Sequence, residues 1–180
     1  SVLKEWNKAR WLLKPLTLKE AYESYQKAWT DETEGKVVWE PGEENDDKTT
    51  GWRLVDTYLR ESHVPAMVKP EAVEVPVEVD LVNHGLPRLI GVLDLVQQRQ
   101  IIDYKTSATT PNADKVAHST EIQTSSYAIL YRHNTGSQET GMQLHHLVKL
   151  KNPKVVITML PSMSPDQETR LFRQMEAYLE

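Results

Sequence analysis

Two aspartates and a lysine lie close together in this sequence, in two short segments that have the pattern of neighbouring β-strands. Asp94 stands in the apolar segment 89–96, and Asp103 and Lys105 stand in the segment 101–106. The polar residues 97–100 between them are few enough for a tight turn, which makes the two segments antiparallel neighbours. Residues two apart share a face of a strand, so Asp103 and Lys105 project together and Asp94 can lie across from Asp103.

Such a group of side chains suits a divalent metal ion. Mg²⁺ takes oxygen ligands and keeps several waters, so two carboxylates and one backbone carbonyl are sufficient, and the carbonyl of Tyr104 is the natural third ligand. Glu74, on the preceding strand, could add another carboxylate. The alternative is a cross-strand ion pair on a solvated surface, which contributes about 0.2–1 kcal/mol to folding stability and has no catalytic role. Both aspartates lie inside apolar segments, which favours the metal because a buried acid needs a partner.

The first half of the chain has the pattern of helices. Thr17-Leu-Lys-Glu20 is a capping box, and apolar residues follow it at helical spacing as far as Trp29. The segment 31–48 is rich in acids and predicts a solvated loop. A second helix is expected over about residues 50–61.

From Ala72 the period of the apolar residues changes to two, which predicts a strand. The order of the elements predicts an α/β (α+β) fold, in which helices flank a mixed central sheet. We expect one domain over residues 1–180, with a helical part of about 1–65 and a core of about 70–180. The further expected elements are strands at 89–96, 101–106, 142–150 and 155–160, one helix from about 113 to 136, and a last helix after Ser164-Pro-Asp-Gln167.

The composition limits the class of protein. Hydrophobic residues make up 39% and charged residues 26% of the chain, and no apolar run reaches the roughly 18–20 residues of a membrane span. Cysteine is absent, which excludes disulfides, thiolate zinc sites and cysteine-ligated iron–sulfur clusters. Without a secretory signal, we expect a cytoplasmic location. The net charge of −5 argues weakly against a protein that coats nucleic acid, but the acids are concentrated in residues 31–48.

Taken together, the motifs resemble the PD-(D/E)XK nuclease superfamily and, within it, the RecB-like exonuclease branch. The resemblance covers about residues 70–135. It depends on the combination of three motifs, which is far more specific than a D-x-K motif alone. It implies a restriction-endonuclease-like core and a DNA nuclease, an exonuclease of DNA repair, recombination or phage DNA processing, that uses Mg²⁺ or Mn²⁺. A helicase or recombination protein is an implied partner. The motifs are Gly91-Val-Leu-Asp94, Ile102-Asp-Tyr-Lys-Thr-Ser107, and Gln123 with Tyr127.

The resemblance also implies roles for the residues of the two strands. Asp94 and Asp103 would bind the metal ion, and Lys105 would orient or activate the attacking water and stabilise negative charge at phosphorus. Glu74 matches the acid that this branch places on the preceding strand. Glu78 is the alternative, because it lies on the same face of that strand.

Gln123 and Tyr127 are one helical turn apart and share a helix face. They match the Q-x-x-x-Y helix that lies over the active site of the family, which implies that they contact the substrate. A core-facing helix with an incidental glutamine is the alternative interpretation.

The chain departs from the branch pattern at its amino end. RecB-like nucleases usually carry a G-x-x-x-H helix there, and no segment before Glu74 has this pattern, so we expect the domain to continue upstream of Ser1. His63 lacks the pattern. His145 and His146 are adjacent in an expected strand and face opposite ways, so they cannot chelate one ion together.

The missing G-x-x-x-H pattern keeps a second hypothesis open, a non-catalytic nucleic-acid-binding or scaffolding module on the same fold.

Overall fold

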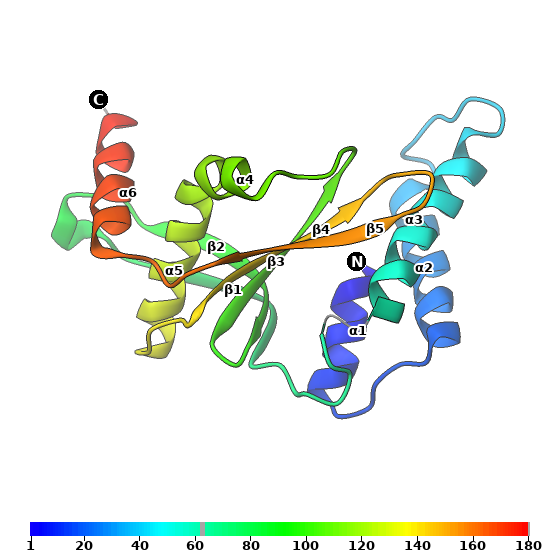
Figure 1. Cartoon of the computed structure of the whole chain (residues 1–180), viewed down its shortest axis with the longest axis horizontal. Coiled ribbons are helices and arrows are strands. Elements are labelled where there is room, and N and C mark those ends of the chain that lie inside the picture. Colours follow the sequence, from blue (N-terminus) through cyan, green and yellow to red (C-terminus); the bar gives the residue numbers. More distant parts are fainter. Residues whose placement is uncertain (62–63, 180) are drawn as a thin grey trace. The chain divides into compact units, whose positions relative to one another are not determined.

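The computed structural model describes residues 1–61 and 64–179 (Figure 1). These residues form an α/β fold in which helices accompany a mixed five-stranded sheet, as the sequence predicts. The elements in chain order are α1 (Val2–Trp11), α2 (Leu18–Thr33), α3 (Glu43–Glu61), β1 (Ala72–Val79), a short 3-10 helix (Val82–His84), β2 (Leu89–Gln97), β3 (Gln100–Ser107), α4 (Ala113–Ser119), α5 (Glu121–Thr135), β4 (Gly141–Val148), β5 (Lys154–Leu160) and α6 (Pro165–Ala177).

The sheet has the strand order β1-β2-β3-β4-β5, the same as the order along the chain. The strands β1, β2 and β3 form an antiparallel meander. Strand β4 runs in the same direction as β3, because the Thr140 N–H donates to the Arg99 carbonyl near the beginning of the two strands and the Lys149 N–H donates to the Ser107 carbonyl near their end. The parallel pair β3–β4 therefore makes the sheet mixed.

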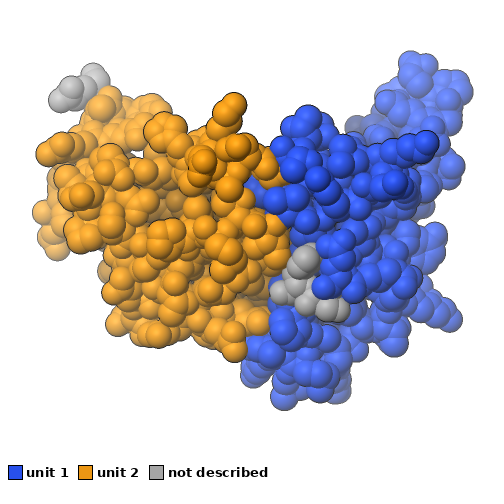
Figure 2. Space-filling model, in the orientation of Figure 1, with its two compact units in different colours: residues 1–70, 105–110, 146–156 blue, residues 71–104, 111–145, 157–180 orange. Residues whose placement is uncertain are grey.

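The described residues divide into two compact units, coloured separately in Figure 2. One unit consists of residues 1–70, 105–110 and 146–156, and the other of residues 71–104, 111–145 and 157–180. The single domain expected over residues 1–180 stays a prediction.

In the first unit, helix α2 packs against both α1 and α3. Its capping box is present, with the Thr17 hydroxyl and the Glu20 carboxylate each bound to the backbone N–H of the other residue. Aromatic rings join α2 to α3, since Trp52 lies 4.8 Å from Tyr22 and 5.7 Å from Tyr25 between ring centroids. These contacts place Trp52 in a helix-packing role.

Three helical predictions need correction. Helix α1 has no counterpart among the expected elements. Helix α2 continues to Thr33 and helix α3 begins at Glu43, so the loop predicted over residues 31–48 is wrong at both ends. The acids of its last part stabilise the N-terminus of α3. The single helix expected from about 113 to 136 is interrupted at Thr120, whose φ and ψ of −105° and 1° end α4.

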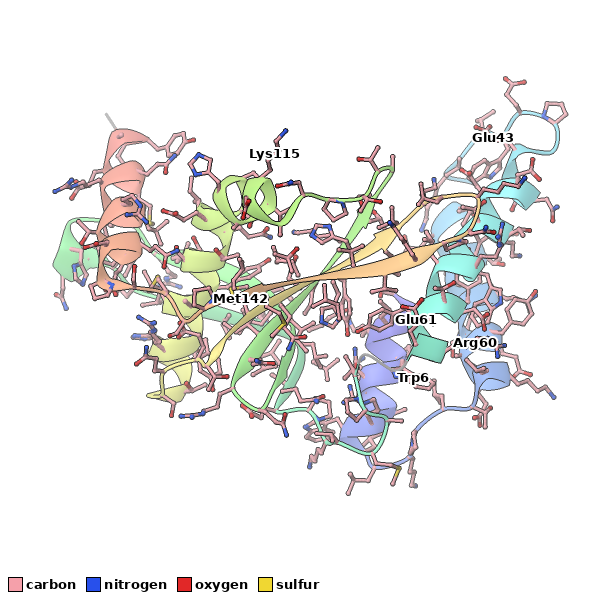
Figure 3. The ribbon with its side chains drawn as sticks, in the orientation of Figure 1. Trp6, Glu43, Arg60, Glu61, Lys115 and Met142 are labelled. Carbon is pink, nitrogen blue, oxygen red and sulfur yellow. The ribbon has the colours of Figure 1, made fainter. Side chains whose placement is uncertain are left out.

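The core of the second unit lies where α5 packs on β1 and β2. Gly91 of β2 shows how close this packing is, because a Cβ atom there would lie 2.7 Å from the Leu130 Cδ1 atom. A glycine at this position therefore allows the helix to approach the strand. A neighbouring apolar cluster includes Leu93, Tyr131 and Met142, the last of which Figure 3 labels. Within the described part of the chain, no helix is long and apolar enough to cross a membrane.

Candidate active site

The hairpin of β2 and β3 has the tight turn that the sequence predicts. Gln98 and Arg99 both have positive φ, 52° and 59°, as a two-residue turn with the twist of a hairpin requires. Next to the turn, Gln97 pairs with Gln100, and the register continues through Val96 to Leu95, which lies opposite Ile102. This turn therefore sets the register of the two strands.

The register ends at Leu95 and Ile102, and its continuation by one residue along each strand would place Asp94 opposite Asp103. Directly opposite residues of an antiparallel pair have Cα atoms about 4.5–5.5 Å apart. The Tyr104 N–H donates to Asp94 Oδ2 at 3.0 Å, which ties this carboxylate to the backbone of β3. Asp103 is buried and Asp94 is half-buried. The fold thus brings together the two aspartates and the Tyr104 peptide.

Lys105 follows Asp103 by two residues within β3, and both lie inside the described strand. Side chains of alternate strand residues project from the same face, so the strand directs the lysine to the face that carries the aspartates. Lys105 is half-buried. A compact ammonium group on a partly solvated strand face can contact an anionic group of a ligand.

Glu74 lies in line with the two aspartates. In the register of β1 and β2, Val73 pairs with Leu95 and Val75 with Leu93, so the position between them places Glu74 opposite Asp94. Its φ of 44° is unusual inside a strand. Left-handed backbone at a residue with a side chain costs about 1–2 kcal/mol, and outside tight turns such strained residues cluster at active sites.

Glu78, the alternative acid, has other neighbours. It lies opposite Ile90, and its carboxylate forms an ion pair with Arg88 at 3.3 Å. The register therefore favours Glu74 over Glu78 as the acid beside Asp94.

The donor set suits a hard divalent cation, because Asp94, Asp103 and the Tyr104 carbonyl supply only oxygen. In residues 1–61 and 64–179, no three His, Asp or Glu side chains gather in a group that could hold a metal ion. The backbone aligns Glu74 with the aspartates, but its carboxylate does not complete such a group. His63, which lacks the branch pattern, lies outside the described residues.

Replacing Glu74 with glycine should make the protein more stable and less active. Glycine adopts positive φ without strain, so the gain of about 1–2 kcal/mol exceeds the entropic cost of about 0.5–1 kcal/mol for glycine in a strand. The free energy of unfolding, measured by urea denaturation, should rise by up to about 1 kcal/mol. Glu78→Gly is the matched control and should lower it, because residue 78 has no positive φ. A fall in the stability of Glu74→Gly would contradict this account of the strand.

The expected pair on α5 is formed. Gln123 Nε2 donates to the Tyr127 hydroxyl at 3.0 Å, which confirms that the two side chains are neighbours on one helix face. Tyr127 also lies near Gly91, where an added Cβ would be 3.7 Å from the Tyr127 ring. The contact positions Tyr127 beside the strand, and its role in substrate binding stays a prediction.

A buried ion pair in the second unit has no motif that could have predicted it. The Glu139 carboxylate receives two bonds of 2.7 Å from the guanidinium of Arg132, and it also accepts the Met163 N–H and the Ser162 hydroxyl. Burial raises the pKa of Glu139, but these four bonds outweigh burial and hold its pKa below the usual value. This network joins α5 to the segment before β4 and to the segment before α6.

Comparisons with known proteins give the family and the fold of the chain. A family model described as the PD-(D/E)XK nuclease superfamily matches residues 1–180. No curated protein matches the sequence. Among solved structures, the fold is similar to that of a provisionally named exonuclease from Eubacterium rectale, with a TM-score of 0.54 and 13% sequence identity. The match covers 90% of this chain and 60% of the other, so the chain spans less than two thirds of the length of that relative.

Proposed function

Because the chain belongs to the PD-(D/E)XK nuclease superfamily, we propose that it is a metal-dependent DNA nuclease that hydrolyses phosphodiester bonds as an exonuclease. The observation that carries the proposal is the 3.0 Å hydrogen bond from the Tyr104 N–H to Asp94 Oδ2, next to the paired residues Leu95 and Ile102 of β2 and β3. Its place in the cell would be cytoplasmic, in DNA repair, recombination or phage DNA processing, with a helicase or recombination protein as a partner.

Asp94, Asp103 and the Tyr104 carbonyl would hold Mg²⁺ or Mn²⁺, with Glu74 as the flanking acid. A divalent ion bound there would acidify water and neutralise charge on the phosphate oxygens. The hydrogen bond from the Tyr104 N–H fixes the Asp94 carboxylate at 3.0 Å from the backbone of β3, so this ligand is held in place before a metal arrives. No iron–sulfur cluster is part of the proposal, since the chain has no cysteine.

Lys105 would act on the substrate rather than on the metal. Its ammonium group stabilises negative charge at the phosphorus atom, or its amine takes a proton from the attacking water. Gln123 and Tyr127 would contact the DNA. Their mutual hydrogen bond orients the glutamine amide and the tyrosine hydroxyl on one face of α5, where both can reach a polar ligand.

A non-catalytic nucleic-acid-binding or scaffolding module is the second candidate. The observation that favours it is the lack of a group of three metal-binding side chains among the residues that the structure describes. Under this hypothesis the protein binds DNA and cleaves none.

A nuclease assay separates the two candidates. The chain is incubated with end-labelled single-stranded and double-stranded DNA in Mg²⁺, in Mn²⁺ and in EDTA, with a closed circular DNA to detect endonucleolytic cuts. We expect cleavage of the linear DNA in either metal, none in EDTA, and an intact circle. Lys105→Ala serves as the control for contaminating nucleases. DNA binding without cleavage in every metal would establish the scaffold instead.

A further inference from the structure

His146 of β4 is a neighbour of Lys105 on β3. The Lys149 N–H donates to the Ser107 carbonyl at 2.8 Å, which in a parallel pair places Val148 opposite Ser107. This register differs by one residue from that of the Thr140–Arg99 bond at the other end of the two strands, and two residues back from Val148 it places His146 opposite Lys105. The rings of Tyr104 and His145 are in contact, with centroids 5.9 Å apart, and these two residues are opposite each other in the same register. Residues opposite each other in a sheet share a face, so this register places the imidazole and the lysine on the same face of the β3–β4 pair.

The His146 ring is buried, with 7% of the residue exposed. Its Nε2 atom has no hydrogen-bond partner within the described part of the chain. Burial lowers the pKa of His146, and the positive charge of Lys105 lowers it further, so the ring is neutral at neutral pH. A neutral imidazole has one nitrogen that donates and one that accepts. A buried polar atom without a partner costs stability, so the native structure needs a reason to keep it.

We propose that His146 is a positioning residue for Lys105, with its Nε2 accepting a hydrogen bond from the Lys105 ammonium group when substrate is bound. This inference rests on the proposed nuclease function. The ammonium group has three donors, so it can give one to His146 and still direct the others at a phosphate oxygen. The contact fixes a flexible four-carbon side chain in one direction, and a displacement of about 1 Å at such a group can cost about 100-fold in rate.

Two substitutions at residue 146 test the acceptor. Glutamine places an amide oxygen near the position of Nε2 and accepts the same hydrogen bond, whereas leucine fills the space and accepts none. In steady-state cleavage of a labelled oligonucleotide, His146→Leu should lower kcat by about 100-fold and change KM by less than about twofold. His146→Gln should keep kcat within about threefold of the wild type. The Tm of His146→Leu should equal or exceed that of the wild type, because the variant removes a buried polar atom without a partner.

Ser125→Ala is the matched control. The Ser125 hydroxyl on α5 is also buried without a hydrogen-bond partner among the described residues, but it does not lie in register with Lys105. Its removal should leave kcat unchanged. Equal kcat values for His146→Leu and the wild type, or equal losses in the leucine and glutamine variants, would overturn the inference while leaving the nuclease function in place.

A measurement that needs no cleavage separates this inference from the proposed function. The ¹⁵N resonance of His146 Nε2 is recorded with Ca²⁺ and an oligonucleotide, in the wild type and in Lys105→Ala. A resonance that moves on addition of DNA in the wild type and not in the variant is the expected result. This result in a protein that cleaves no DNA would refute the nuclease function and support the contact, and a resonance that is the same in both proteins would refute the contact.

Discussion

Replacing Asp103 with alanine should abolish both cleavage and metal binding, whereas Lys105→Ala should abolish cleavage and leave metal binding intact. The difference follows from β3, where continuation of the register would place Asp103 opposite Asp94 and Lys105 is the next residue on the same face. An aspartate supplies an oxygen ligand to a hard cation, and an ammonium group cannot. The lysine stabilises charge that develops at phosphorus, and loss of such a group costs about 10³-fold in kcat.

Cleavage of labelled DNA and calorimetric titration with Mn²⁺ measure the two properties. Lys154→Ala, which removes an exposed lysine at the beginning of β5, is the control for a change of charge alone and should retain full activity. Circular dichroism checks that every variant is folded. Cleavage at the wild-type rate by either Asp103→Ala or Lys105→Ala would refute the assignment of the β2–β3 hairpin as the active site.

Arg132→Ala should destabilise the second unit by about 3 kcal/mol, because it leaves the buried Glu139 carboxylate without its main partner. Arg170→Ala is the matched control. Arg170 also forms a 2.6 Å ion pair, with Glu121, but its side chain is more than half exposed, so its loss should cost about 1 kcal/mol or less. Urea denaturation of both variants gives the comparison, and equal losses of stability would contradict the special role of the buried pair.

The ion pair of Arg132 with Glu139 also predicts how the stability of the protein depends on pH. The pKa of Glu139 is lower in the folded protein than its usual value of 4.5, so the unfolded chain binds the proton more readily. The contribution to stability is therefore complete above about pH 4.5 and is lost as the pH falls through the lowered pKa of the folded state. In Arg132→Ala this acid loss should be smaller, because the guanidinium that lowers the pKa is gone.

Local patterns in the sequence determined the hairpin and the helix that packs beside it. A short polar turn between two apolar segments admits one antiparallel register, and strand alternation then assigns Asp94, Asp103 and Lys105 to their places. The capping boxes before α2 and α6 could be predicted from the sequence because their hydrogen bonds join residues only three apart. Gln123 and Tyr127 are one turn apart, so helix geometry alone makes them neighbours.

Only the tertiary structure decided contacts between residues far apart in the chain. The choice of Glu74 as the neighbour of Asp94 depends on the register of β1 with β2, and its positive φ has no sequence signal in a residue other than glycine, asparagine or aspartate. The position of His146 beside Lys105 depends on the pairing of β3 with β4, which are separated by two helices. Strand alternation says which way a side chain points, but its partner is set by which strand lies alongside.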